Sequence, residues 1–193
     1  MGMALSGKPQ VVIQPHLEQL AGATYALAAN RISHVLGLVG PSVAMDTASA
    51  SSLVAACFAV REARAPQRAS SAAAVRAVAA GVNLNLHPNL THMHTARHLF
   101  ARDGRCKTFD AAADGFERGE GCGALVMRPL SAASNDLIVA TVAGAAIVHK
   151  GGGASLRAMR GPAIIHKTQA ALRDAGLLPS ELKLIEASGL GEP

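Results

Sequence analysis

The sequence predicts a layered α/β fold in which helices pack against a sheet. Stretches that favour strands alternate with longer stretches that favour helices, which is the pattern of α/β folds. Half of the 193 residues are apolar but only 3% are aromatic, so small aliphatic side chains must build a closely packed core. Only 16% are charged, against about 25% in an average soluble domain. This low share predicts a surface partly covered by another subunit.

Two helices are predicted near the start of the chain. Apolar residues recur mostly at three- and four-residue steps from Leu17 to Leu36, and Gly37 is expected to end that helix. A short extended segment, Pro41 to Ala48, follows. Ser49 is expected to open a second helix that runs to about Arg64, where the nearby proline stops it. Since this helix is apolar on nearly every side, it should be buried.

The rest of the chain predicts strands separated by a loop-rich stretch and one helix. The loop-rich stretch, His87 to Gly121, holds much of the charge. An amphipathic helix is expected from Ala163 to Ala175. A second structural unit is expected to begin near Leu137. The predicted strands are Val82–Leu84, which should be buried, Ala124–Met127, Ile138–Val148 and Leu182–Ala187.

Composition argues against several classes of protein. The net charge of +5 comes from scattered Lys and Arg with few aromatic side chains, so nucleic acid is not an expected partner. Three cysteines without a CxxC pair argue against a disulfide framework or cysteine zinc site, and favour a reducing, intracellular compartment. The longest apolar run, Leu137 to Val148, is shorter than the roughly 20 residues of a membrane span, so no transmembrane segment is predicted.

The N-terminus lacks the features of a secretory signal, but Met1-Gly2 with Ser6 matches the short myristoylation pattern. Such a short match arises often by chance, and one acyl chain anchors a protein only marginally.

Two other patterns invite a ligand-binding interpretation. The histidines of one short stretch could suggest a metal, yet no Cys, Asp or Glu lies among them, so loop histidines are the better interpretation. Gly151-Gly152-Gly153 resembles a phosphate-binding loop only superficially, because the dinucleotide fingerprint and the Walker Lys-Ser/Thr are absent. No metal or other cofactor is therefore predicted. The histidines are His87, His92, His94 and His98.

The most informative segment is Val43 to Val54, VAMDTASASSLV, where a predicted strand turns into a predicted helix. A side chain at such a turn lies at the positive end of the helix dipole, where backbone N–H groups can hold an oxyanion or lower a nucleophile's pKa. Ser49 is the candidate nucleophile. The alternative is that Ser49 only caps the helix, since serine is a preferred N-cap.

Three motifs, in order, resemble the β-ketoacyl synthase (ketosynthase) domain of polyketide and fatty-acid synthases. They are AANRISHVLGLVGPSVAMDTASASSLVAA from Ala28, AAGVNLNLHP, and DGRCKTFDAAADGFERGEGCGALVMRPLS, and the resemblance continues to AGLLPSELKLIEASGLGEP at the end. It implies a thiolase-like layered α/β/α fold, present here as an incomplete, central portion. Residues 1–23 would be an N-terminal extension, 24–136 the end of the N-terminal half, and 137–193 the start of a truncated C-terminal half.

The resemblance also implies an activity, namely condensation of an acyl thioester with malonyl units delivered on an acidic acyl carrier protein. This sequence departs from the family at the residues that perform it. The family's nucleophilic cysteine is replaced by Ser49, and its first catalytic histidine by Ser188. The second histidine would lie beyond Pro193. Cys57 cannot substitute, because eight helical residues separate it from Ser49 by about 12 Å of rise.

These departures predict a ketosynthase-family chain that does not condense and acts as a binding or scaffold subunit. The alternative is an acyltransferase or decarboxylating chain that uses Ser49, with histidines supplied by a partner. A homo-oligomer or larger assembly is expected. Four basic residues could contact an acidic carrier protein, or could form a solvated loop in which Arg118 pairs with Asp110 or Asp114. They are Arg102, Arg105, Lys107 and Arg118.

Overall fold

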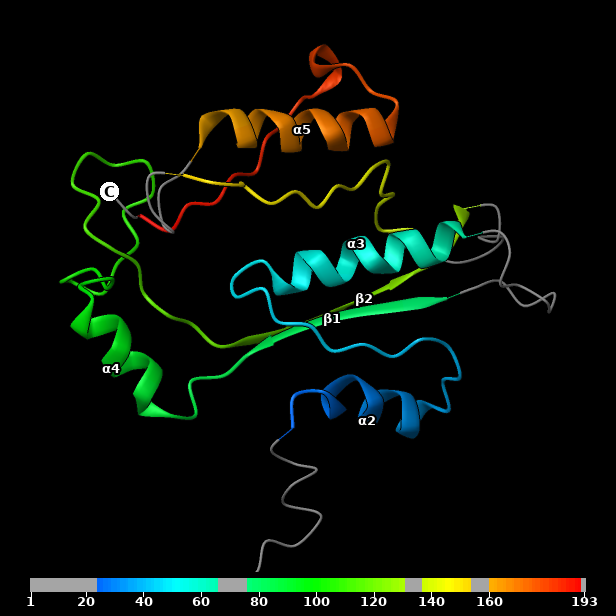
Figure 1. The fold of residues 1–193 in the computed structure, drawn as a ribbon, viewed down its shortest axis with the longest axis horizontal. Coiled ribbons are helices and arrows are strands. Elements are labelled where there is room, and N and C mark those ends of the chain that lie inside the picture. The colour runs from blue at the N-terminus through cyan, green and yellow to red at the C-terminus, as the bar shows by residue number, and fades with distance from the viewer. Residues whose placement is uncertain (1–23, 66–75, 131–136, 154–159, 192–193) are drawn as a thin grey trace, which may run out of the picture. The chain divides into compact units, whose positions relative to one another are not determined.

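The computed structural model describes residues 24–65, 76–130, 137–153 and 160–191. The chain divides into two compact units, residues 1–47 and 48–193. The helices and strands follow one another as α2, α3, β1, α4, β2 and α5 (Figure 1). The predicted N-terminal extension and its acylation pattern lie outside the described residues. The boundary expected near Leu137 stays a prediction.

The first unit contains α2, Leu27–Leu36. The helix ends where predicted, because Gly37 adopts a left-handed φ of 63° and its N–H bonds the carbonyls of the last turn. Its start differs from the prediction. Residues 24–26 form a turn ahead of Leu27, and the remainder of the predicted helix, 17–23, lies outside the described residues.

The second unit is centred on an antiparallel strand pair with α3 packed against it. Strand β1, Ala77–Asn83, pairs with β2, Gly121–Met127, and helix α3, Ser51–Arg64, contacts both strands. The approach is close. A Cβ on Gly81 would lie 2.5 Å from the Cβ of Ser52, so only glycine fits there. The predicted helix and the strand at 124–127 are confirmed, with α3 starting two residues later than Ser49.

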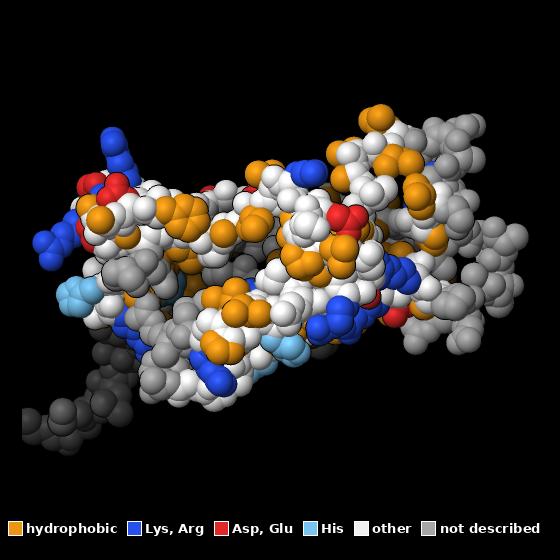
Figure 2. Space-filling view, turned by 90° about the horizontal axis from the view of Figure 1, so that it is seen from above, with side chains coloured by type: hydrophobic (Ala, Val, Ile, Leu, Met, Phe, Trp, Pro, Cys, Tyr) orange, Lys and Arg blue, Asp and Glu red, His pale blue; other side chains and the backbone are white. Residues whose placement is uncertain are grey.

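The prediction that α3 is buried on nearly every side is wrong. The helix buries Cys57, Ala59 and Val60, but Leu53 is 71% exposed. The strand predicted at Val82–Leu84 is likewise not buried, since Val82 is 67% exposed. The physical reason is that one helix on two strands covers only one face of each element in the described residues. Figure 2 shows many apolar side chains at the surface of the face it draws.

Helix α4, Pro88–Ala96, lies inside the stretch predicted to be loop. Pro88 occupies the first turn, where its missing N–H costs nothing, and the His87 ring nitrogen accepts the N–H of Asn89 at the N-cap. After α4 the chain forms a parallel bridge between Phe100 and Phe116, whose rings lie 5.6 Å apart. This bridge holds together the two ends of a loop that carries candidate site residues.

Helix α5, Gly161–Ala175, confirms the third predicted helix and is followed by a 3-10 turn at Pro179–Glu181. The strands predicted at Ile138–Val148 and Leu182–Ala187 are not assigned as strands, and neither segment pairs with another within the described ranges. In the described part of the chain, β1 and β2 form a sheet of two strands alone. No helix in the described ranges is long and apolar enough to cross a membrane.

Candidate active site

The turn that carries Ser49 has an unusual backbone. Ala48, directly before Ser49, adopts a left-handed φ of 53°, which costs a residue with a Cβ about 1–2 kcal/mol. The N–H of Ser51 donates to the Ala48 carbonyl at 3.0 Å and its hydroxyl donates to the same oxygen at 2.7 Å. These two bonds hold the turn, and Ser49 projects from it as an exposed residue.

The interpretation of Ser49 as a helix cap is wrong. The N-cap of α3 is Ala50, and no side chain caps the helix. Ser49 therefore stands just ahead of a 14-residue helix whose first turn has no acidic residue. The positive end of the helix dipole favours negative charge near position 49. No histidine, lysine or carboxylate among the described residues forms a hydrogen bond with Ser49. The helix dipole thus favours negative charge at Ser49, but no described side chain is placed to take the proton of its hydroxyl.

Ser188 lies on a C-terminal segment that is fixed to the loop after α4. The Thr108 hydroxyl donates to the Gly189 carbonyl at 2.5 Å, and the Gly115 N–H donates to the Gly191 carbonyl at 3.0 Å. Gly191 has a φ of 73°, and a Cβ there would lie 2.8 Å from the Lys107 nitrogen, so the close approach requires glycine. Ser188 itself is exposed. No hydrogen bond joins it to Ser49 in the described structure.

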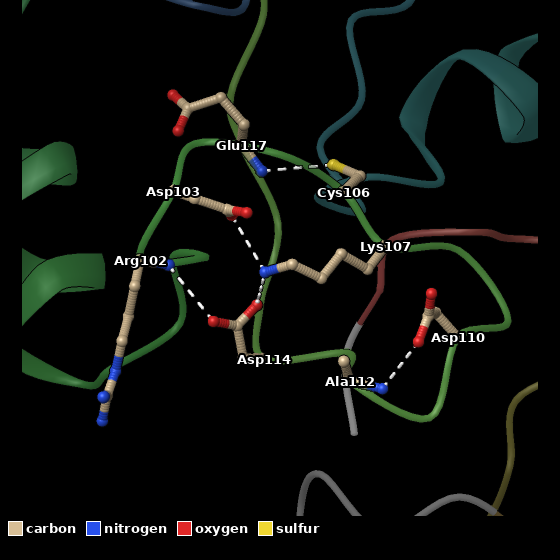
Figure 3. A network of polar contacts seen from close by, with 8 residues as sticks. All are labelled: Arg102, Asp103, Cys106, Lys107, Asp110, Ala112, Asp114 and Glu117. Atoms are coloured by element: carbon tan, nitrogen blue, oxygen red, sulfur yellow. Dashed lines mark hydrogen bonds and ion pairs between the residues drawn. The ribbon is translucent and has the colours of Figure 1, made fainter.

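Lys107 organises that loop rather than presenting a free charge. Its Nζ lies 2.5 Å from Asp114 Oδ1 and 2.9 Å from Asp103 Oδ1 (Figure 3). The second oxygen of Asp114 accepts the Arg102 N–H at 3.4 Å. The prediction that Lys107 contacts a carrier protein stays a prediction, and the charge of Lys107 is already paired with two carboxylates. Arg102 and Arg105 are exposed.

The alternative pairing of Arg118 with Asp110 or Asp114 is also wrong. Asp114 pairs with Lys107, and Asp110 accepts the Ala112 N–H at 2.8 Å to close its own short turn (Figure 3). One guanidinium nitrogen of Arg118, Nη1, is buried without a hydrogen-bond partner. Residues within a single loop can pair in several ways, and sequence spacing does not choose among them.

The ion pairs of Lys107 shift the pKa values of all three partners. The hydrogen bonds from Lys107 lower the pKa of Asp103 and of Asp114 below the ordinary 3.8, and those two carboxylates raise the pKa of Lys107 above 10.5. The carboxylates thus stabilise the folded loop above pH 3.8, and that contribution is lost as the pH falls through their lowered values. The ammonium contribution is lost as the pH rises through the raised pKa of Lys107.

Replacing Lys107→Met is expected to remove part of the acid sensitivity of this loop. Amide hydrogen exchange at Gly115 and Gly191 should be slower in the unmodified chain than in the variant at pH 6, with the difference shrinking as the pH falls below about 3.8. Lys167→Met on the exposed side of α5 is the matched control. Equal protection of Gly115 in both chains at pH 6 would show that the ion pairs do not hold the loop.

The predicted histidine group is spread over different roles. His87 caps α4, while His94 packs edge-on to Phe100 at 5.5 Å and to Phe116 at 5.9 Å. Among the described residues, no group of three or more His, Cys, Asp or Glu side chains is placed to hold a metal ion. The Gly151 N–H donates to the His149 ring, and Arg160 donates to the Gly152 carbonyl. These polar groups of the Gly-rich stretch are therefore already hydrogen-bonded to neighbouring residues of the chain.

Cys57 lies in the core of the second unit, as predicted. It is only 7% exposed, and burial raises the pKa of its thiol, with a smaller opposing influence from Arg61. A thiol with a raised pKa is a poor nucleophile near neutral pH. Cys57 is therefore not placed to act as a nucleophile.

Comparison with a family model and with known proteins relates this chain to ketosynthases of polyketide synthases. Residues 3–133 match the family described as "Beta-ketoacyl synthase, N-terminal domain". The chain is 39% identical over 173 residues to a phenolphthiocerol/phthiocerol polyketide synthase of Mycobacterium bovis, covering 89% of this chain and 9% of that protein. It is 42% identical over 170 residues to polyketide synthase ThaG of Burkholderia thailandensis, covering 87% of this chain and 3% of that protein.

Solved ketosynthase structures share the fold. The oxazolomycin ketosynthase domain OzmH KS7 of Streptomyces albus JA3453 matches with a TM-score of 0.80 and 34% identity, over 91% of this chain and 32% of that one. The ketosynthase from module 6 of the bacillaene synthase of Bacillus subtilis 168 matches with a TM-score of 0.79 and 30% identity, over 91% and 31%. This chain thus spans about a third of these ketosynthase chains, and its thiolase-like α/β fold is the corresponding part of theirs. The chain belongs to the β-ketoacyl synthase family.

Proposed function

We propose that this chain is a non-condensing ketosynthase-family subunit that binds other components of a polyketide or fatty-acid synthase assembly. The observation that carries the proposal is the pair of serines, Ser49 and Ser188, which the resemblance matches to the family's nucleophilic cysteine and first catalytic histidine. A serine hydroxyl becomes a nucleophile only when a positioned base removes its proton. The described residues supply no such base to Ser49.

The size of the expected defect is large. Nucleophile and base act as a unit, so losing either removes most of the chemical rate enhancement, on the order of 10⁴-fold or more. What remains is binding. The turn at Ser49 is open, and its helix dipole favours an anion or the polarised carbonyl of a thioester. Retained binding geometry without a nucleophile fits a scaffold role.

An acidic acyl carrier protein is the proposed partner. Arg102 and Arg105 are exposed on the loop that also holds the Ser188 segment. Basic side chains at the edge of a binding surface attract an acidic partner and orient it, and they make the affinity sensitive to salt. Lys107 is less suited to this role, because its charge is already paired with two carboxylates.

A second candidate function is acyl transfer or decarboxylation through Ser49, with imidazoles supplied by a partner chain. The exposure of Ser49 ahead of α3 favours it. Under this alternative the Ser49 hydroxyl would attack a thioester carbonyl while its proton passes to the partner's base. The tetrahedral intermediate would then break its C–S bond, release the thiol with that proton, and leave an acyl-serine. It differs from the first proposal in requiring a covalent acyl-enzyme.

The proposed partner is tested by charge reversal. Arg102→Glu with Arg105→Glu should weaken binding of a phosphopantetheinylated acyl carrier protein about tenfold, measured by titration calorimetry, and rising salt should weaken the unmodified complex. Lys167→Glu with Arg173→Glu, exposed on α5, is the matched control. Binding unaffected by the loop reversal and by salt would contradict a carrier-protein role for this loop.

A further inference from the structure

A hollow lies between the end of α4 and the loop that Lys107 organises. Its volume is about 440 Å³, which is the size of a small-molecule site. Neither Ser49 nor Ser188 lines it, so it is separate from the turn described above. Its lining side chains are those of Thr95, His98, Phe100, Arg102 and Asp114.

Phe100 gives the hollow an aromatic wall that its neighbours hold in place. The ring packs edge-on against Phe116 at 5.6 Å and against His94 at 5.5 Å. The Ala101 N–H donates to the Phe116 carbonyl at 3.1 Å, so the backbone beside the ring is fixed as well. One more aromatic ring placed edge-on to Phe100 would extend this cluster, because aromatic pairs prefer that geometry.

Arg102 brings a positive charge that no carboxylate neutralises. Its backbone N–H donates to Asp114, but its guanidinium forms no hydrogen bond or ion pair in the part of the chain that the structure describes. Figure 3 shows this side chain extending away from Asp103 and Lys107. A guanidinium presents parallel N–H donors, whose spacing matches the two oxygens of a carboxylate.

The neighbouring charges favour a ligand with a single negative charge. Lys107 pairs with both Asp103 and Asp114, and one ammonium against two carboxylates leaves one negative charge. Arg102 balances that charge, and a dianion would leave the surroundings strongly negative. Both oxygens of Asp114 already accept hydrogen bonds, from Lys107 and from the Arg102 N–H, so Asp114 does not compete for the guanidinium.

His98 completes the lining with an unfavourable backbone conformation. Its φ is 51°, in the left-handed region that disfavours a residue with a Cβ. Its N–H donates to the Thr95 carbonyl at 3.0 Å, while its imidazole has no hydrogen-bond partner among the described residues. Strained residues of this kind gather at ligand-binding sites, and the imidazole supplies a further polar group beside Arg102.

We propose that this hollow binds an aromatic monocarboxylate, with the carboxylate on Arg102 and the ring against Phe100. One bidentate ion pair and one ring contact predict a Kd on the order of 1 mM for a ligand as small as benzoate. The inference goes beyond the proposed scaffold function, because it involves neither Ser49 nor a carrier protein.

The test titrates the full chain with benzoate and follows the backbone amide signals of His98, Phe100 and Arg102 by NMR. Benzyl alcohol, which has the same ring without the charge, should bind roughly tenfold more weakly. Phenyl phosphate, which carries the ring on a dianion, should also bind roughly tenfold more weakly. Cyclohexanecarboxylate, which keeps the charge on a ring that is not aromatic, should bind about threefold more weakly.

The variants separate the site from a general effect of charge. Arg102→Gln should weaken benzoate binding roughly tenfold. Arg105→Gln, which removes the same charge from the same loop outside the lining, is the matched control and should change it less than about twofold. His98→Gly should weaken binding about threefold without lowering the thermal midpoint, because glycine adopts a positive φ freely.

Equal effects of Arg102→Gln and Arg105→Gln would overturn the proposal, as would the absence of any shift with benzoate at ten times the expected Kd. Benzyl alcohol or phenyl phosphate binding as tightly as benzoate would overturn the ligand class. Binding of the acyl carrier protein to Arg105→Gln is measured separately. A failure of this hollow to bind benzoate is therefore distinguishable from a failure of the proposed carrier-protein contact.

Discussion

Ser49→Cys is expected to create a thiol whose pKa lies below the ordinary value of about 8.5 and which is alkylated at pH 7 roughly tenfold faster than a mid-helix thiol. The reason is the geometry of the turn. Position 49 precedes the first turn of α3, where uncapped N–H groups and the helix dipole favour the thiolate. Burial would raise the pKa, but residue 49 is exposed, so the dipole dominates.

The measurement is the rate of iodoacetamide alkylation against pH, with Cys57, Cys106 and Cys122 replaced by alanine. Gln169→Cys in the middle of α5 is the reference thiol, because residue 169 is also exposed but far from either helix end. A thiol at position 49 that titrates at or above the value of the reference would mean that the nucleophile turn does not act through its dipole.

Condensation is expected to stay absent even when the family's residues are restored in part. Ser49→Cys, and Ser49→Cys combined with Ser188→His, should both turn over at least about 10⁴-fold more slowly than an intact ketosynthase. Ser188→His introduces one imidazole on a segment that the hydrogen bonds of Gly189 and Gly191 hold in place. The resemblance implies two catalytic histidines, and this substitution supplies one of them.

The assay follows β-ketoacyl product from acyl and malonyl thioesters by mass spectrometry, with the bacillaene module 6 ketosynthase as positive control. Ser49→Cys with Ser188→Gln separates any effect of the imidazole from an effect of side-chain size. Turnover by the Ser49→Cys chain on its own would contradict the proposal that this chain does not condense.

Sequence patterns predicted the regular elements whose signals are local. Helix α5 followed from its apolar spacing, and the end of α2 followed from Gly37. The structure ends α5 at Gly176, whose φ is 67°. Helix α4 lies in the stretch predicted to be loop, because Pro88 fits the end of the preceding strand as well as the start of a helix. A proline at N1 after a residue able to cap, here His87, was the available signal.

The long-range features could not be predicted in the same way. Whether Ile138–Val148 pairs as a strand depends on the presence of a neighbour, which the segment's own residues do not encode. The left-handed Ala48 is equally hidden, since alanine carries no preference for that conformation. The choice of Lys107 rather than Arg118 as the partner of Asp114 is a tertiary outcome. The predicted turn from strand to helix identified Ser49 as a candidate nucleophile, whereas Ser188 was identified only through the resemblance to a family.

The most direct test of the non-condensing assignment is the intact mass of the unmodified chain after incubation with acyl and malonyl thioesters, alone and with the acyl carrier protein. The chain should keep its mass in both mixtures, because a serine without a base does not attack a thioester at a useful rate. A Ser49→Ala chain provides the baseline for nonspecific acylation. An acyl adduct that maps to Ser49 and is absent from Ser49→Ala would contradict the account and establish the acyltransferase alternative.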